Sequence, residues 1–409
     1  MTKQRTRDEV VRRNTILLVV AQGALLAMSA TFFTLAVVAI VDLTGRERWA
    51  GILLAIFNTS AAVSALLVGR LMDRFGRRPG LAIGYSLFAV AGFGGTLAVW
   101  MGSSWLLLAM AIPFGAGLGA GQLGRVAVAD MYPSNVRGRM VGIIVAAGTL
   151  GAIFGAPVVA AIEAATGSTV APWLLIPFFG AIGLTSVLLL RPDPRDLAEA
   201  VPETAQARPG RRLGELLQIP PFRAAIAAIA IAQTAMVAVM GITPVVIDDY
   251  GGSALAIALV ISFHMVGMFA LAPVIGALLD RYGRRPGLLV GGLLTAVGAR
   301  LGSFTEVTAL IGVGLFLVGL GWSACYLGAT AAISDLTTAG ERGGALGFTD
   351  LSTSVASAVG ALAGGFVLES SGIAVVGIVM AVLMVPALAL VAPLREPSPG
   401  RWTVPEPAK

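Results

Sequence analysis

A twelve-residue segment occurs twice in this chain, and this repeat constrains the fold more than any other feature. The first cassette is GRLMDRFGRRPG at residues 69–80, and the second cassette is GALLDRYGRRPG at residues 276–287. Nine of the twelve positions are identical, and the copies are 207 residues apart (276 − 69). A repeat of this period indicates two homologous halves rather than a solenoid of short units.

The composition places both halves in a membrane. The 409 residues are 57% hydrophobic and 12% charged, whereas a soluble domain has about 25% charged residues. A membrane helix needs about 20 mostly apolar residues. We find six such segments in each half, at about 15–41, 50–72, 80–101, 104–128, 140–162 and 172–191, and at about 223–247, 252–279, 287–304, 307–333, 343–367 and 372–393.

These segments predict an all-α polytopic membrane protein with twelve transmembrane helices in two pseudo-symmetric six-helix bundles. The expected parts are a first bundle at 1–191, a charged, proline-rich linker at 192–222, a second bundle at 223–395 and a tail at 396–409. With the N-terminus inside, the cytoplasmic segments and helix ends hold 24 of the 28 lysine and arginine residues. This asymmetry predicts a cytoplasmic (inner) membrane protein with both termini in the cytoplasm.

Several classes of function are excluded by what the sequence lacks. The single cysteine, Cys325, excludes a disulfide framework within the chain and a multi-cysteine metal site. The net charge of +6 comes from basic residues at helix ends, where topology explains them, so we expect no nucleic-acid partner. There is no Walker motif for ATP, and no paired carboxylates or histidine clusters point to an enzyme. We expect no metal and no cofactor.

The cassettes resemble the signature of the major facilitator superfamily, G-x-L-x-D-R-x-G-R-R, which lies between helices 2 and 3. A second repeat supports the resemblance, because an Asp-x6-Arg-Gly pattern recurs at an offset of 205 (335 − 130). The resemblance implies a conformational lock on the cytoplasmic side of the membrane. The predicted lock residues are Gly69, Asp73, Arg74, Gly76, Arg77, Arg78, Asp130 and Arg137, and Gly276, Asp280, Arg281, Gly283, Arg284, Arg285, Asp335 and Arg342.

The residue types fit this role. Gly69 and Asp73 lie one helical turn apart, so Gly69 would let a neighbouring helix approach while Asp73 faces the N-terminus of helix 11. Gly76 permits a tight turn. The resemblance implies that Arg77 reaches an acid at the end of helix 4, where Asp130 stands. A solvated surface charge cluster is the alternative interpretation.

Ionisable residues within the predicted spans are costly in a bilayer and usually functional. Arg125 in helix 4 and Asp350 in helix 11 lie at similar depth, so we predict that they form an inner gate pair. His264 lies near the middle of helix 8, and an unperturbed histidine titrates near neutral pH. His264 and Asp350 are therefore candidate proton-relay residues. A neutral, packed His264 with one hydrogen bond is the alternative.

Helix 5 carries a second motif. Gly142-x8-Gly151-x3-Gly155 is followed by Pro157, and this pattern resembles the antiporter signature of the same family. Ordinary packing of small residues against another helix is the alternative. Helix 1 carries no acid, although many drug/proton antiporters of this family have one there or elsewhere in the first half.

In the fold that the resemblance implies, helices 1, 4, 7 and 10 line a central cavity. Sparse polar groups on apolar walls suit a lipophilic or amphipathic solute. The candidate cavity residues are Gln22, Gln122, Arg125, Gln233, Thr234, Trp322 and Tyr326, with Ser29 and Thr31 as further polar groups.

We therefore predict a monomeric, non-enzymatic secondary transporter that moves a small organic solute across the lipid bilayer by alternating access. The leading version is proton-coupled efflux of a lipophilic or amphipathic compound. An importer or uniporter of a nutrient or metabolite is the first alternative. A non-transporting membrane receptor with a transporter fold is the second.

Overall fold

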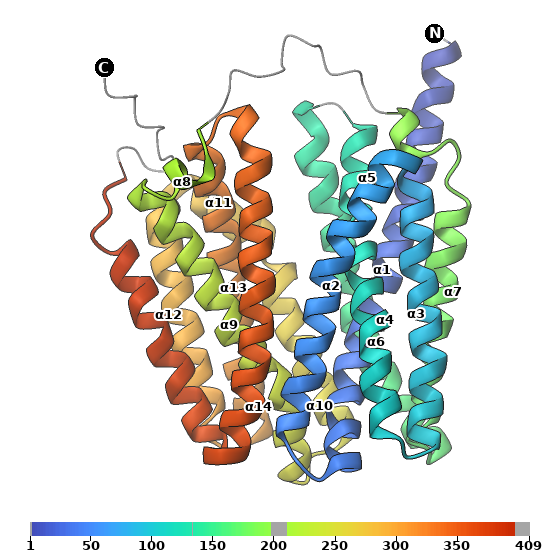
Figure 1. Ribbon diagram of the computed structural model, residues 1–409, viewed down its shortest axis with the longest axis vertical. Coiled ribbons are helices and arrows are strands. Elements are labelled where there is room, and N and C mark those ends of the chain that lie inside the picture. The colour runs from blue at the N-terminus through green and yellow to red at the C-terminus, as the bar shows by residue number, and fades with distance from the viewer. Residues whose placement is uncertain (1, 133, 198–210, 397–409) are drawn as a thin grey trace. The chain divides into compact units, whose positions relative to one another are not determined.

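The computed structural model describes residues 2–132, 134–197 and 211–396, and all regular elements in this part of the chain are helices (Figure 1). Nine of these described helices are long and apolar enough to cross a membrane, or ten if one bent pair counts as a single span. The expected all-α membrane fold is confirmed. The helices are consistent with twelve spans, because α14 contains two helices and the 19-residue α12 is a further helix of near-spanning length.

The chain divides into two compact units, residues 1–200 with 251–262 and residues 201–250 with 263–409. The first unit contains α1 (Thr2–Thr44), α2 (Arg48–Phe75), α3 (Arg77–Trp100), α4 (Ser104–Gly121), α5 (Gly124–Met131), α6 (Ser134–Thr166), η1 (Ala171–Leu174), α7 (Leu175–Leu188) and η2 (Pro194–Leu197). The second contains α8 (Leu213–Leu216), α9 (Pro220–Asp249), η4 (Val266–Ala270), α11 (Ala272–Tyr282), α12 (Arg284–Gly302), α13 (Thr308–Leu336) and α14 (Ala339–Val391). Helix α10 (Ala254–Met265) crosses the boundary at residue 262.

Glycine sets the helix packing of the first unit. Helix α4 packs between α2 and α3, and α1 packs against α6 and α7 (Figure 1). A Cβ atom at Gly115 or Gly119 of α4 would overlap a backbone carbonyl of α2, because the two helices are in backbone contact there. Small residues allow such approach in membranes, where helices associate by close packing rather than by the hydrophobic effect.

In the second unit, α9 packs along α14, and α12 packs along α13 (Figure 1). A Cβ atom at Gly360 of α14 would overlap the Thr234 carbonyl of α9, and one at Gly291 of α12 would lie 2.8 Å from the Gly321 carbonyl of α13. Glycine-mediated contact therefore recurs in both units.

Some helix boundaries differ from the predicted spans. Helix α1 begins at Thr2 instead of near residue 15, and the fourth span is broken at Gln122 and Leu123 into α4 and α5. The eighth span contains the π-helix η4 and bends by 40° between residues 270 and 272. The last two spans run on as the 53-residue α14, whose only non-helical residue is Gly372 at φ +78°.

Candidate functional site

In the first unit, Arg77 of the first cassette forms ion pairs with two carboxylates. Its Nη1 donates to Asp73 Oδ1 at 2.7 Å, and its Nε donates to Asp130 Oδ2 at 2.6 Å. The Arg77 side chain is 13% exposed and Asp130 is 22% exposed, so water screens this pair only partly. The fork of guanidinium donors suits two acids on different helices.

The second cassette repeats this arrangement in the second unit. Arg284 Nη1 donates to Asp280 Oδ1 at 2.7 Å, and its Nε donates to Asp335 Oδ2 at 3.2 Å. The Arg284 side chain is 9% exposed. In each unit, the cassette arginine therefore links an aspartate at the end of the preceding helix to an aspartate at the end of a helix about 50 residues later.

Sequence reasoning missed one acid in each network. The backbone N–H groups of Arg77 and Arg78 donate to the two carboxylate oxygens of Asp193 at 2.9 and 2.8 Å. The N–H groups of Arg284 and Arg285 donate to the two oxygens of Glu396 at 2.8 and 3.1 Å. Each carboxylate thereby accepts hydrogen bonds from N–H groups that have no partner within the helix, and its negative charge is stabilised by the positive end of the helix dipole.

A sequence signal for these acids exists. Asp193 and Glu396 each stand just after the last apolar span of their half, and they are 203 residues apart (396 − 193). That offset is close to those of the other repeated residues, so a search for matched acids at this offset would have found them.

The turn glycine of each cassette is required by this geometry. Gly76 has φ +103° and Gly283 has φ +106°, a region that favours glycine. A Cβ atom at Gly76 would lie 2.7 Å from Asp193 Oδ2, and one at Gly283 would overlap the Glu396 carboxylate. Any larger residue would therefore push the acid away from the helix end.

The remaining lock residues have separate surroundings. The Arg74 and Arg281 guanidinium groups lie over the rings of Phe75 and Tyr282, at 5.1 and 5.3 Å from the ring centroids. A Cβ atom at Gly69 would meet Leu123 Cδ1 at 4.0 Å, an ordinary contact, and one at Gly276 would have no described neighbour within 4 Å. The side chains of Arg137 and Arg342 lie outside the described part of the chain. The lock function stays a prediction.

A further ion pair fixes the end of the linker to the second unit. Glu341 accepts hydrogen bonds from the backbone N–H and Nε of Arg211 at 2.7 and 2.8 Å, and from Arg211 Nη2 at 2.9 Å. Arg211 Nη2 also donates to the Leu336 carbonyl at 2.8 Å, and Glu341 accepts from Thr338 N–H in a capping box. The hydrogen bonds from Arg211 hold the pKa of Glu341 well below its ordinary value, and those bonds raise the pKa of Arg211.

We expect Glu341→Gln to lower the stability of the second unit by about 2–3 kcal/mol at pH 7, because Arg211 loses its charged acceptor. Since the pKa is lower in the folded state, this contribution is fully present above the ordinary value of 4.5 and is lost progressively as the pH falls from there through the lower folded-state value. Melting curves of both proteins at pH 7 measure the difference, and curves at successively lower pH below 4.5 should show it shrink. Glu306→Gln, at an exposed acid just before α13, is the control, and an equal loss there would contradict the assignment.

The candidate cavity residues of the second unit form a connected group. Trp322 Nε1 donates to Gln233 Oε1 at 2.5 Å, and Gln233 Nε2 donates to Ser357 Oγ at 2.8 Å. The Trp322 and Tyr326 rings stack with centroids 5.1 Å apart, and Phe269 meets Trp322 edge-on at 6.1 Å. Three helices thus orient one partly exposed aromatic pair.

Thr234 belongs to the same contact between α9 and α14 as Gln233 and Ser357. Thr234 bonds to the Ala230 and Ala356 carbonyls of its own unit. In the first unit, Gln22 is 5% exposed and contacts α6, because a Cβ atom at Gly148 would lie 3.2 Å from Gln22 Cγ. Gln122 ends α4 and is partly buried, and Arg125 lies in the first turn of α5.

His264 is completely buried. Its Nδ1 lies 2.7 Å from the Leu315 carbonyl, and because a carbonyl only accepts, Nδ1 carries a proton. Nε2 has no hydrogen-bond partner among the described residues. Asp350, the other relay candidate, is exposed on α14, and its backbone carbonyl accepts from Ser354 Oγ at 2.8 Å. The relay and the inner gate pair with Arg125 stay predictions.

The helix 5 motif combines two structural roles. A Cβ atom at Gly151 would overlap the Gly23 carbonyl, and one at Gly155 would lie 2.7 Å from the Ala27 carbonyl, so both glycines let α6 touch α1. Pro157 has no N–H to donate to the Ile153 carbonyl one turn earlier. Ser262 Oγ of α10 donates to that carbonyl at 3.1 Å, and this part of α10 belongs to the first unit.

Comparisons with known proteins agree with this architecture. The family model described as Major Facilitator Superfamily matches residues 17–263 and 224–409. The uncharacterised MFS-type transporter YdeG of Bacillus subtilis (strain 168) is 29% identical over 364 residues, which cover 85% of this chain and 84% of that protein. The riboflavin transporter RfnT of Brucella anthropi is 27% identical over 381 residues, covering 90% of this chain and 92% of that protein.

A solved structure shows the same fold. The human organic anion transporter MFSD10 aligns with a TM-score of 0.66 at 16% identity, covering 93% of this chain and 99% of that chain. The family match spans nearly the whole chain and includes both cassettes. The chain belongs to the major facilitator superfamily, and it is a membrane transporter rather than an enzyme.

Proposed function

We propose that this transporter exports a planar, amphipathic organic solute across the cytoplasmic membrane in exchange for protons, acting as a monomer with both termini in the cytoplasm. The observation that carries the substrate class is the stacked pair of Trp322 and Tyr326 with Gln233 hydrogen-bonded to the indole. Stacked rings present a flat apolar face, and such faces bind other flat rings in offset geometry.

The surroundings of this pair support a solute with an apolar ring and few polar groups. Gln233 has both ends of its amide engaged, by Trp322 and by Ser357, so it orients the indole. The similarity to a riboflavin transporter over 90% of the chain is consistent with a flat heteroaromatic solute.

Trp322→Ala should raise the KM for such a solute about tenfold, because the stacking face is lost. Initial rates of riboflavin and ethidium flux into proteoliposomes of known orientation measure this, and Trp322→Phe should recover most of the affinity. Trp105→Ala, an exposed tryptophan of the first unit that contacts Trp49, is the matched control. An unchanged KM in Trp322→Ala would remove the aromatic pair from the substrate site.

The direction of transport is supported by the helix 5 pattern of Gly142, Gly151, Gly155 and Pro157, which resembles the antiporter signature. Uptake or facilitated diffusion of a metabolite is the second candidate, and the absence of an acid on the first predicted helix favours it. An imposed proton gradient distinguishes the two. Export by exchange moves the solute uphill in the direction opposite to the proton flow. Coupled uptake would move the solute uphill in the same direction as the protons, and a uniporter would only equilibrate the solute.

We infer that His264 is the proton-relay residue of this exchange, with Asp350 as the second candidate. His264→Gln retains a hydrogen-bond donor toward Leu315 but cannot carry a proton, so uphill transport should be abolished while solute exchange at equal pH persists. Flux with and without a pH gradient separates the two results. Uphill transport with a normal pH profile in the variant would make His264 a packing residue.

A further inference from the structure

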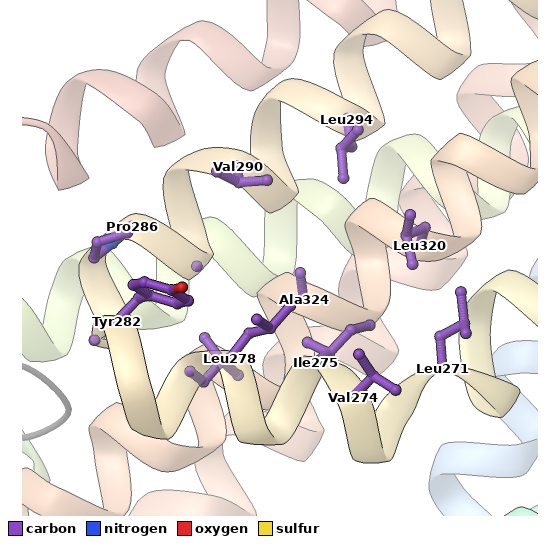
Figure 2. Close-up of a pocket in the computed structure, with 13 residues that line it drawn as sticks. Leu271, Val274, Ile275, Leu278, Tyr282, Pro286, Val290, Leu294, Leu320 and Ala324 are labelled. Atoms are coloured by element: carbon purple, nitrogen blue, oxygen red, sulfur yellow. The ribbon is translucent and has the colours of Figure 1, made fainter.

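Helices α11, α12 and α13 border an apolar groove of about 640 Å³ in the second unit (Figure 2). Val274, Leu278 and Val290 are 56%, 49% and 54% exposed, so large apolar side chains face the surroundings of this unit. The lining is otherwise aliphatic or glycine and proline, except for the Tyr282 ring (Figure 2). This volume lies within the range of pockets that bind small organic ligands.

A polar pocket of about 520 Å³ adjoins the groove and shares Tyr282 and Pro286 with it. It is lined by Arg285, Arg395 and Glu396. Both oxygens of Glu396 accept backbone N–H groups at the start of α12, so its charge is offset by the helix end. The two guanidinium groups therefore give this pocket a positive character.

The groove and the pocket together have the polarity of one amphipathic molecule. Aliphatic walls lead directly to a basic pocket at the end of α11, where the chain leaves the apolar span. Basic pockets beside membrane helices are the environment that anionic lipid headgroups select. The second cassette forms part of both walls, since Gly283 and Gly287 line the groove and Arg285 lines the pocket.

We propose that the groove and pocket bind one anionic phospholipid, with an acyl chain between α11 and α12 and the phosphate at Arg285 and Arg395. The bound lipid contacts the start of α12 beside Arg284, whose side chain holds Asp280 and Asp335. The lipid would therefore stabilise the network of the second cassette. This site is independent of the identity of the transported solute.

Native mass spectrometry of detergent-solubilised protein with phosphatidylglycerol and phosphatidylcholine of identical acyl chains tests the proposal. We expect phosphatidylglycerol to bind about tenfold more tightly, because two arginines attract its charge. Arg285→Gln with Arg395→Gln should remove this preference. Val290→Trp, which fills the groove, should weaken the binding of both lipids.

The internal repeat supplies matched controls. Arg74→Gln with Arg78→Gln removes two arginines of the first cassette, and Ile83→Trp is the equivalent of Val290→Trp (290 − 207 = 83). These controls should leave lipid binding unchanged. Glycerophosphoglycerol, the headgroup without acyl chains, should not compete, and competition at equal concentration would mean that an anion alone is bound.

A photoreactive phosphatidylglycerol with a diazirine in its acyl chain tests the wild-type protein without any substitution. Labelled peptides from residues 271–294, or from α13 around Leu320 and Ala324, would support the groove. Labelling spread over helices that do not line the groove, equal affinity for the two lipids, or full binding by Val290→Trp would each overturn the proposal.

Discussion

Gly151→Ala should destabilise the first unit by about 3 kcal/mol or more and abolish transport. The added methyl group would overlap the Gly23 carbonyl, so α1 and α6 would have to separate along their contact. Overpacking of a close interface commonly costs about 1–3 kcal/mol, and a rigid backbone atom offers less relief than a side chain. Thermal melting in detergent and flux in proteoliposomes measure the two effects.

Gly142→Ala is the matched control, because Gly142 belongs to the same motif and helix. A Cβ atom there has no described neighbour within 4 Å, and alanine favours a helix over glycine by about 1 kcal/mol. This variant should therefore melt at or slightly above the wild-type temperature. If both variants behaved alike, the motif would act through helix flexibility rather than through the α1–α6 contact.

Arg77→Met should cost about 2–3 kcal/mol of stability and reduce transport strongly. The substitution leaves the carboxylates of Asp73 and Asp130 without the guanidinium that joins them, and Asp130 is mostly buried. Removing one partner of a shielded ion pair is more damaging than removing both, because the remaining charge is left poorly solvated.

A double-mutant cycle with Asp130→Asn tests this explanation. Arg77→Met with Asp130→Asn should be more stable than Arg77→Met alone, and Arg78→Met, at the next residue, should have a small effect. Strictly additive melting shifts would show that the 2.6 Å contact contributes nothing measurable to folding. The same cycle at Arg284 and Asp335 measures whether the equivalent ion pair contributes equally to the stability of the second half.

The helical membrane fold was predictable because each apolar span is a local property of the sequence. The contact of Arg77 with Asp73 was within reach for the same reason, since the two residues are four positions apart. Asp193 and Glu396 were missed because each lies more than 100 residues from the helix end that it caps, and no local spacing rule connects them.

Other features depend on contacts that only the folded chain reveals. From its charge alone, Glu341 would be expected on the surface. In the structure its side chain is buried and paired with Arg211, which lies at the far end of the linker. Pro157 signals a free carbonyl at Ile153, yet nothing near it in the sequence identifies Ser262 as the donor. The π-helix at 266–270 likewise follows no recognisable sequence pattern.

The two acids that cap the cassette helices also set an order of events during synthesis. The first cassette lies at residues 69–80, but its cap becomes available only after Asp193 has left the ribosome, and the Ser262 contact with α6 follows later still. The second cassette waits in the same way for Glu396. Because chains emerge N-terminal end first, the first half can complete its charge network while the second is still being translated. A nascent chain arrested before residue 193 would therefore expose the uncapped start of α3 to the membrane insertion machinery, and one arrested before residue 396 would expose only that of α12.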